Sequence, residues 1–314
     1  MKKKRERSRR VLVLAVLGCM AAMQGGWARD WAGVPVPAAA GSGQVWQLEE
    51  TWSDDFNYEG KGAAFAAKWR DVYINAWTGP GLTEWAADHS AVRDGRLVIG
   101  ASRKEGTDKV YCGVVTSPEP LTYPVFMEIN MKVSGLVLSS NFWLLSADDR
   151  QELDIVETYG SRRSDWFAQR MSTNYHIFER GAETNDILAN HNDQQFYLLP
   201  DGAPLRDGFH RFAAYWKDPW HVDFFLDGVL VRQLRRDGIT DPYGIGLERP
   251  MFLIIDTEDH AWRSSQDIVA SDEELADGTI NEMLVDWVRV YRPVGAGSAV
   301  EEQSWGEVKE EAGE

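Results

Sequence analysis

The sequence predicts an all-β fold, either a β-sandwich or a jelly roll. Three observations indicate this: one strictly alternating run, one hairpin joined by Asp-Gly, and several further short β-rich runs separated by turn residues. One clear helix start is present, at Ser271 with Glu274 three residues later, and Gly278 would end that helix after about two turns. Many short strands with little helix are typical of these β architectures.

The alternating run covers residues 125–133. Apolar residues stand at every odd position from Val125 to Val133, with Glu128, Asn130 and Lys132 between them. Because side chains of a strand point alternately to opposite sides, this pattern predicts one buried face and one solvent-exposed face.

The hairpin lies within residues 222–231, where two apolar runs flank Asp227 and Gly228. Asp-Gly between alternating apolar runs is the strongest short-range signal for a two-residue hairpin turn. Five other runs predict strands by their β-branched and aromatic content: residues 97–101, 141–145, 209–216, 251–255 and 284–291.

The first 28 residues have the pattern of a secretory signal peptide. Seven basic residues precede a 12-residue apolar run from Val11 to Ala22, and Gly26-Trp27-Ala28 offers a small-x-small cleavage site. The apolar run is shorter than the ~20 residues of a membrane-spanning helix, so we expect no integral membrane span. We therefore expect a secreted, extracellular protein. The alternative is a lipid anchor on Cys19, since residues 16–19 resemble a lipoprotein box.

The rest of the chain divides by composition. Residues 29–45, rich in Pro and Gly, predict an irregular N-terminal arm. Residues 46–294 contain no linker or internal repeat and predict a single domain. Residues 295–314 hold six glutamates, and we expect this acidic tail to be disordered.

Composition excludes several functional classes. The formal net charge is -16, and loss of residues 1–28, with seven basic and one acidic residue, would make it -22, which disfavours a nucleic-acid partner. No phosphate-binding glycine motif occurs, so dinucleotide and P-loop enzymes are disfavoured. Cys112 would be the one remaining cysteine, so no intrachain disulfide is expected. We expect a monomer that needs no cofactor for catalysis.

The candidate chemistry concentrates in residues 151–157, Gln-Glu-Leu-Asp-Ile-Val-Glu. Glu152 and Asp154 share a face of a strand, whereas Glu157 would point the other way unless one residue is bulged out. The spacing therefore predicts a β-bulge around Ile155 and Val156, which would bring three carboxylates onto one surface.

Crowded carboxylates suit glycoside hydrolysis. They raise one another's pKa, which separates an ionised nucleophile from a protonated acid. Carboxyl groups ~5.5 Å apart would retain configuration, and a wider separation would invert it. Two other interpretations are the solvated face of an ordinary sheet and a calcium site. Aromatic residues on both flanks favour a sugar-binding cleft, and the absence of a calcium-loop pattern disfavours the ion.

The run Glu152-Leu-Asp-Ile-Val-Glu157 resembles the ExDxxE signature of glycoside hydrolase family 16, whose members share a concanavalin-like jelly roll with a substrate cleft on the concave sheet. Other segments resemble the secreted bacterial β-agarases of this family, so the resemblance covers nearly the whole chain: residues 30–37, 75–82, 123–128, 140–146, 216–220 and 285–293.

The resemblance implies roles for individual residues. Glu152 would be the nucleophile, Asp154 its partner and Glu157 the acid/base. Trp77 and Trp143 would be aromatic platforms, His176 and Arg180 polar contacts to the sugar, and Glu258 and Trp262 the other wall of the cleft. The structural alternatives are core positions for Trp77 and Trp143, an ordinary strand position for His176 and a loop-capping role for Glu258.

Members of the family often bind a structural calcium on the convex face. Asp286 would hold it here, with Asp55 as a second ligand, although a solvated Asp in a strand explains Asp286 almost as well.

The resemblance implies a retaining endo-β-agarase that hydrolyses β-1,4 galactosidic bonds of agarose through a covalent glycosyl-enzyme. The alternatives are a porphyranase or carrageenase on the same fold, or a galactan-binding lectin without catalysis. The segments closest to the acids, residues 139–146 and 256–262, contain no basic residue. We therefore expect a preference for unsulfated galactan. The alternative is a local basic pocket formed by arginines that lie near these segments in the sequence: Arg150, Arg162, Arg163, Arg180 and Arg263.

Overall fold

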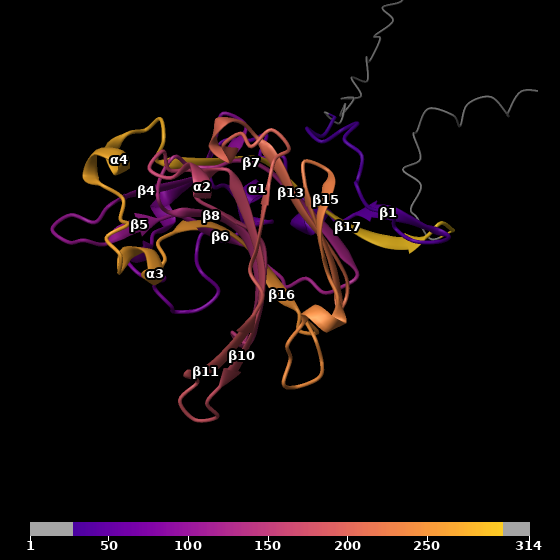
Figure 1. The fold of residues 1–314 in the computed structure, drawn as a ribbon. Coiled ribbons are helices and arrows are strands. Elements are labelled where there is room, and N and C mark those ends of the chain that lie inside the picture. The colour runs from indigo at the N-terminus through magenta and orange to yellow at the C-terminus, as the bar shows by residue number, and fades with distance from the viewer. Residues whose placement is uncertain (1–27, 298–314) are drawn as a thin grey trace, which may run out of the picture.

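The computed structural model describes residues 28–297. These residues form two β-sheets that pack face to face (Figure 1). The predicted all-β sandwich is therefore confirmed. The expected signal peptide and nearly all of the expected acidic tail lie outside the described residues.

The larger sheet has the strand order β15-β14-β13-β7-β17-β4-β5-β2, with β1 paired to β17 and β3 paired to β4. All of its pairs are antiparallel except the parallel pair of β2 and β5. Its strands are β1 (Gln44–Leu48), β2 (Thr83–Trp85), β3 (Ser90–Arg93), β4 (Arg96–Arg103), β5 (Val110–Cys112), β7 (Val125–Lys132), β13 (His210–Asp218), β14 (His221–Leu226), β15 (Val229–Leu234) and β17 (Glu282–Gly295).

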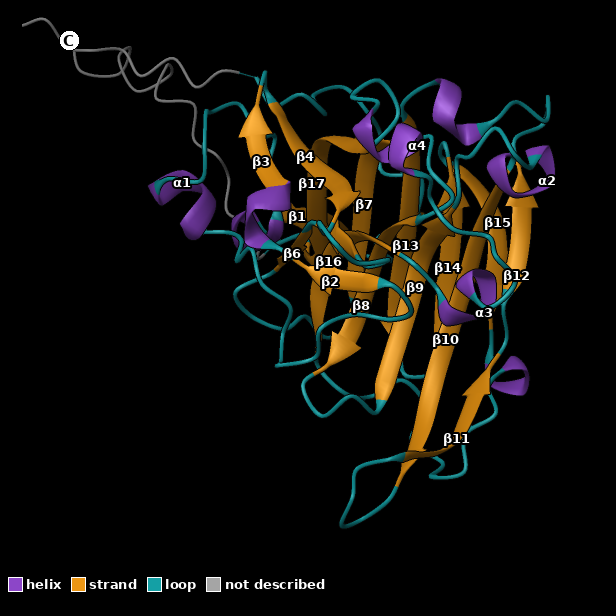
Figure 2. Cartoon of the chain, turned by 90° about the vertical axis from the view of Figure 1, so that its left-hand side faces the viewer, coloured by secondary structure: helices purple, strands orange, loops and turns teal. Residues whose placement is uncertain are grey.

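The smaller sheet has the order β11-β10-β9-β8-β16-β6, with β12 also paired to β10. It lies in front of the larger sheet in Figure 2. Its strands are β6 (Val114–Thr116), β8 (Ser139–Ser146), β9 (Gln151–Thr158), β10 (Arg170–Arg180), β11 (Ile187–Asn192), β12 (Gln195–Leu198) and β16 (Met251–Glu258).

The strand predictions agree with these elements. Four of the five β-rich runs fall within β4, β8, β16 and β17, and the run 209–216 begins one residue before β13. Asp227 and Gly228 connect β14 to β15 with positive φ values of 48° and 81°, as a type I′ hairpin turn requires.

Helices are short and lie outside the sheets: α1 (Ala63–Ala66), α2 (Asp165–Ala168), α3 (Ala261–Ser264) and α4 (Asp272–Ala276). The capping box between Ser271 and Glu274 is confirmed at the start of α4, but that helix ends at Ala276, before the predicted Gly278. None of the described helices is long and apolar enough to cross a membrane.

The main core fills the space between the two sheets. Inward-facing side chains of both sheets meet there, among them Met127 and Ile129 from β7 and Leu153 and Ile155 from β9, all fully buried. A free thiol at Cys112 is also buried.

The prediction of a solvent-exposed face on β7 is wrong near Glu128, which is fully buried. The N-terminal arm covers this part of the sheet. Arg289 on β17 donates to Glu128 Oε2 (Nε, 2.6 Å), to the carbonyl of Val34 (Nη1, 2.6 Å) and to that of Pro35 (Nη2, 3.1 Å). Burial raises the pKa of Glu128, and the Arg289 charge opposes that rise. Alternation alone could not reveal a cover supplied by another segment of the chain.

A small apolar cluster continues this cover along the arm. Trp46 packs on Phe126 and Tyr215, and its Nε1 donates to the carbonyl of Ala38 at 2.8 Å. The N-terminal arm is therefore held on the larger sheet by apolar contacts and by hydrogen bonds from a charged side chain.

We predict that Glu128→Leu lowers the free energy of unfolding by about 3–5 kcal/mol, because it leaves the Arg289 charge buried without its carboxylate. In the double variant Glu128→Leu/Arg289→Met the free energy of unfolding should fall by less, since neither charge of the buried pair remains. Urea denaturation measures both. Glu282→Leu, which breaks the exposed pair with Arg93, is the control and should cost about 1 kcal/mol or less. A double variant no more stable than Glu128→Leu would contradict this account.

Candidate active site

Strand β9 carries the predicted bulge. On its β8 side, Phe142 pairs with Val156 and Trp143 pairs with Asp154, so Ile155 has no opposite residue. The register with β10 shifts at the same place. One extra residue in β9 therefore reverses the direction of the side chains that follow it.

The bulge separates acids from apolar residues. Leu153, Ile155 and Val156 are fully buried in the main core. Glu152, Asp154 and Glu157 line a cavity of about 350 Å³ on the other face of the sheet. Three carboxyl groups that a regular strand would divide between two faces thus share one surface.

His176 on β10 lies beside the first two acids. Its Nε2 is 3.5 Å from Glu152 Oε1 and 3.3 Å from Asp154 Oδ2, and its Nδ1 contacts Asn190 Oδ1 at 2.9 Å. Burial alone would lower the pKa of His176, but the two carboxylates outweigh it and raise that pKa to about 10. Burial outweighs the ring, so the pKa of Glu152 rises to about 8, and the imidazolium limits that rise.

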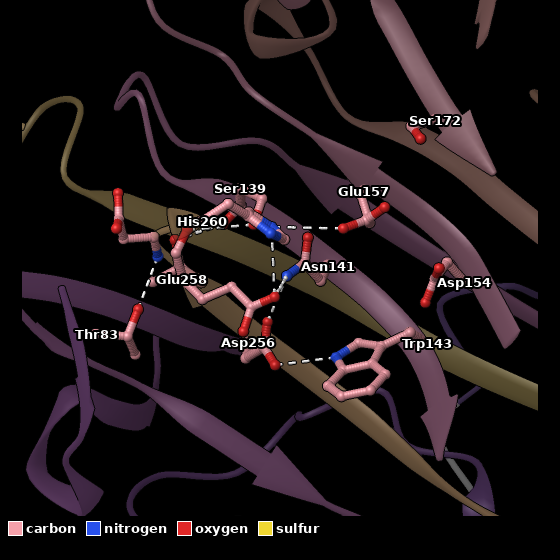
Figure 3. Close-up of polar contacts among 12 residues, drawn as sticks. Thr83, Ser139, Asn141, Trp143, Asp154, Glu157, Ser172, Asp256, Glu258 and His260 are labelled. Carbon is pink, nitrogen blue, oxygen red and sulfur yellow. Dashed lines mark hydrogen bonds and ion pairs between the residues drawn. The ribbon is translucent and has the colours of Figure 1, made fainter. Parts of the chain in front are cut away.

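Glu157 lies beside a second imidazole, that of His260, with a 3.4 Å separation between Glu157 Oε1 and Nε2 (Figure 3). Burial, and then the charge of Asp154, hold the pKa of Glu157 well above its usual range. Burial and the charge of Arg263 lower the pKa of His260 to about 4, although Asp154 opposes them. A protonated Glu157 therefore faces a neutral imidazole.

A network between β8 and β16 forms the floor of the cavity. Asn141 Nδ2 donates to Asp256 Oδ1 at 2.8 Å and to Glu258 Oε1 at 3.1 Å, and Trp143 Nε1 donates to Asp256 Oδ2 at 2.9 Å (Figure 3). Burial raises the pKa of Asp256 to about 7, against the effect of these two donors. The network fixes the side chains on which a ligand would rest.

A second cavity, of about 550 Å³, adjoins the first and shares Tyr73, Trp77 and Glu152 with it. Together the two cavities form an elongated groove over the smaller sheet. An extended polymer fits such a groove better than a compact metabolite does. The first cavity is lined by Tyr73, Trp77, Pro80, Asn141, Trp143, Glu152, Asp154, Glu157, Asn174, His176, Asn192, Gln194, Glu258, His260 and Trp262.

Comparison with protein families identifies the family of the chain that forms this groove. A family model described as "Beta-porphyranase A-D, GH16 domain" matches residues 46–293. The chain belongs to glycoside hydrolase family 16. This family assignment was predicted from the ExDxxE run, and it is confirmed.

Several named family 16 proteins are similar to the chain. β-Agarase AgaB34 of Agarivorans albus is 47% identical over 282 residues, which is 86% of this chain and 62% of that protein. The extracellular agarase of Streptomyces coelicolor is 42% identical, over 84% of this chain and 89% of that protein. The chain thus spans less than two thirds of the length of the Agarivorans relative.

Solved structures of family 16 agarases have the same fold. The structure of β-agarase A from Zobellia galactanivorans superposes with a TM-score of 0.77 at 40% identity, covering 85% of this chain and all of that one. A structure of β-agarase A in complex with oligoagarose gives a TM-score of 0.76 at 41% identity. The concanavalin-like jelly roll expected for the family is confirmed.

The aromatic residues implied by the family resemblance occupy two kinds of position. Trp77 and Trp262 line the cavity and are 47% and 46% exposed, so both offer an open ring to a ligand. Trp143 also lines it but is 6% exposed, and its indole N–H is held by Asp256. A platform role thus suits Trp77 and Trp262 better than Trp143, and all three roles stay predictions.

The implied polar residues also lie along the groove. Glu258 and His176 line the first cavity, and Arg180 lines the second. The Arg180 guanidinium is already engaged: Nε donates to the carbonyl of Asp149 at 2.6 Å and Nη1 to that of Asn185 at 2.9 Å. Its contact to sugar stays a prediction.

Sequence reasoning missed several residues that the fold brings to the cavity. Asn141 and His260 stand within segments that the resemblance had drawn attention to, but neither was assigned a role. Tyr73, which stacks on Trp85 with centroids 5.6 Å apart, carries no motif. The remaining missed residues are Pro80, Asn174, Asn192, Gln194 and Asp256.

The two acid–imidazole groups have a geometry that a cation could use, since the ligand atoms of each lie within 4.8 Å of one another. Each group places an imidazole beside carboxyl groups that line the first cavity: His176 beside Glu152 and Asp154, and His260 beside Glu157 and Glu258.

The expected calcium ligands have poor surroundings for a cation. Asp286 Oδ2 accepts from Asn130 Nδ2 at 3.1 Å, and its other oxygen lies 3.8 Å from Arg96 Nε. Asp55 Oδ2 lies 3.5 Å from Arg29 Nη1. Each carboxylate already faces a guanidinium, whose charge opposes a metal ion. Structural calcium at this place stays a prediction.

We predict that Trp77→Ala mainly weakens ligand binding, whereas Trp143→Ala mainly lowers stability. Loss of the exposed Trp77 ring should weaken saccharide binding several-fold, with a change in unfolding free energy below about 1 kcal/mol. Loss of the buried Trp143 ring should cost about 3–5 kcal/mol of stability. Oligosaccharide titration calorimetry and urea denaturation separate the two effects. Equal stability losses would show that the two rings are not distinguished by burial.

Proposed function

We propose that this chain is an endo-acting β-agarase that hydrolyses β-1,4 galactosidic bonds of agarose with retention of configuration. One observation carries the proposal: the bulge in β9 directs Glu152, Asp154 and Glu157 into a groove long enough for a polymer. The named relatives, two β-agarases and an extracellular agarase at 40–47% identity, support agarose as the substrate.

The surroundings of the two glutamates support their roles. Glu152 attacks the anomeric carbon, because the neighbouring imidazolium of His176 favours its ionised form. Glu157 gives its proton to the departing sugar oxygen, because burial and Asp154 keep it protonated. In the second step Glu157 takes a proton from the water that releases the sugar from Glu152. Asp154 lies between them and holds His176 in place.

The charge along the groove favours an unsulfated substrate. Apart from histidine, no basic residue lines the first cavity within the described chain. Arg180 in the second cavity uses two of its five N–H donors on backbone carbonyls. A sulfate ester would need Arg or Lys donors. Neutral galactose and anhydrogalactose units can instead stack on Trp77 and Trp262.

A porphyranase is the second candidate, because the matching family model is described as a β-porphyranase domain. Porphyran differs from agarose in carrying sulfate, so the two functions differ in what the groove must do with negative charge. A lectin without catalysis is disfavoured, since all three acids are present and face the groove.

We further propose that the protein acts outside the cell as a monomer. The signal-peptide pattern of residues 1–28 and the extracellular relative in Streptomyces coelicolor support export. Anchoring through Cys19 is the alternative. Mass spectrometry of the mature N-terminus distinguishes them: a chain beginning at Arg29 supports release, and a lipidated Cys19 supports anchoring.

We predict that Glu152→Ala abolishes agarose hydrolysis while leaving thermal stability nearly unchanged, because a groove-facing carboxyl contributes little to the core. Azide should restore part of the turnover on an activated glycoside and give a product of inverted configuration. Glu152→Ala with wild-type activity would exclude the nucleophile assignment. NMR of the first-formed product of the wild-type protein tests retention.

We predict that kcat/KM is higher on agarose than on porphyran at every salt concentration. The net charge of -16 and the shortage of basic groups along the groove both repel a sulfated polymer, and added salt should narrow the difference by screening. Product analysis over a salt series measures this. Faster cleavage of porphyran at low salt would favour the porphyranase and leave the roles of the three acids intact.

A further inference from the structure

The carboxyl group of Glu157 lacks a hydrogen-bond partner within the described residues. Among the hydrogen bonds of residues 28–297, none ends on this carboxyl, although its side chain is only 13% exposed. The imidazole Nε2 of His260 lies 3.4 Å from Oε1. A normal N–H···O bond is about 0.5 Å shorter than this. His260 is therefore close enough to bond Glu157 after a small movement.

The hydrogen bonds of Ser139 determine which imidazole nitrogen carries the proton. Ser139 Oγ donates to the carbonyl of Glu258 at 3.2 Å, which uses its one hydrogen. The same oxygen lies 3.0 Å from His260 Nε2, and we assign it as the acceptor of an Nε2–H group, which leaves the hydroxyl hydrogen for the carbonyl. The neutral imidazole therefore carries Nε2–H, and this group points towards the acids.

The Nε2–H group has three acceptors within reach but bonds one of them. Ser139 Oγ is at 3.0 Å, whereas Glu157 Oε1 and Glu258 Oε1 are each at 3.4 Å (Figure 3). Glu258 Oε1 already accepts from Asn141. An ionised Glu157 would be a stronger acceptor than a hydroxyl. Whether the Nε2–H group bonds Ser139 or Glu157 therefore depends on the charge of Glu157.

The ring of His260 has little freedom besides this small movement. His260 is the N-cap residue of α3, and its backbone carbonyl accepts from the amides of Arg263 (2.8 Å) and Ser264 (3.1 Å). The ring packs against Tyr159 and Trp262, with centroids 5.9 Å and 6.5 Å away. The backbone and both aromatic rings thus keep Nε2 directed at the acids.

We propose that His260 is a positioning residue for the acid/base Glu157. Its Nε2–H bonds Ser139 while Glu157 is protonated and moves to Glu157 Oε1 when that carboxyl ionises. His260 keeps its own proton throughout: the proton that Glu157 loses goes to the departing sugar oxygen, and the proton that it regains comes from water. The role rests on the proposed function, because only hydrolysis requires Glu157 to change charge twice per turnover.

The inference predicts opposite changes from two variants. His260→Leu removes the donor and should raise the pKa of Glu157, because the ionised form loses its hydrogen bond. Ser139→Ala removes the competing acceptor and should lower that pKa, because Nε2–H then turns to Glu157. His260→Gln retains an N–H donor of similar reach and should restore most of the wild-type value. A role in packing alone would not give changes of opposite sign.

Carbon-13 NMR titration of glutamate side-chain carboxyls, without substrate, measures these pKa changes, and Glu157→Gln identifies the resonance. We expect a rise of about one unit in His260→Leu and a fall in Ser139→Ala. All other charged or titratable groups facing Glu157 remain in these variants: Glu152 and Asp154 on β9, Tyr159 after it, His176 on β10, Asp256 and Glu258 on β16, and Arg263 behind the imidazole.

Agarose hydrolysis by the same proteins gives the second measurement. In His260→Leu we expect kcat to fall about 10- to 100-fold with KM within twofold, and the basic limb of the kcat/KM profile to move with the NMR pKa. His89→Leu is the control, since it also removes a histidine bonded to a serine, His89 Nε2 to Ser102 Oγ at 2.6 Å, but outside the groove. Its activity should match that of the wild type.

The outcomes separate this inference from the proposed function. An unchanged Glu157 pKa in both His260→Leu and Ser139→Ala overturns the inference even if agarose is cleaved. A wild-type protein that leaves agarose intact overturns the substrate, while the NMR titration still decides the role of His260. If His260→Leu does not fold, Ser139→Ala decides it alone, and an unchanged or raised pKa there counts against the inference.

Discussion

The active site depends on one extra residue in β9. Without the bulge at Ile155, Glu157 would point into the apolar space between the sheets, where an unpaired carboxyl is costly. The neighbouring strands specify the bulge from both sides, since their pairing with β9 resumes only when one residue is left unopposed. Leu153, Ile155 and Val156 hold it from below as part of the core. Fold and chemistry therefore share the same three apolar side chains.

The two histidines beside the acids differ in charge, since one imidazole is protonated and the other is neutral. His176 has Glu152 and Asp154 within 3.5 Å and retains its proton, whereas His260 is buried near Arg263 and stays neutral. Two glutamates that resemble each other in sequence thus meet an imidazolium and an imidazole. The two glutamates of β9 therefore have different electrostatic surroundings, which is what the proposed roles of nucleophile and acid require.

Local patterns in the sequence were enough to predict nine of the seventeen described strands, the Asp227-Gly228 turn and the bulge, because each depends on spacing within a few residues. The same spacing brought out the three acids. Asp256 on β16 and His260 just after that strand lie more than 100 residues from Asn141 on β8, so no local pattern in the sequence could predict that they meet. The buried Glu128 was mistaken for a surface residue for the same reason, since its cover comes from the N-terminal arm.

The position of β17 has a consequence for how the chain folds. This strand comes last in sequence, yet it lies between β7 and β4 in the larger sheet and also pairs with β1, so that Leu48 faces Tyr291 (Figure 2). The larger sheet is therefore incomplete until residues 282–295 have been synthesised and β17 has paired with β4 and β7. Pairings of such high contact order are slow, and the waiting edges of β4 and β7 can pair with other chains in the meantime. Aggregation of nascent or truncated chains is thus governed by the last strand, far from any catalytic residue.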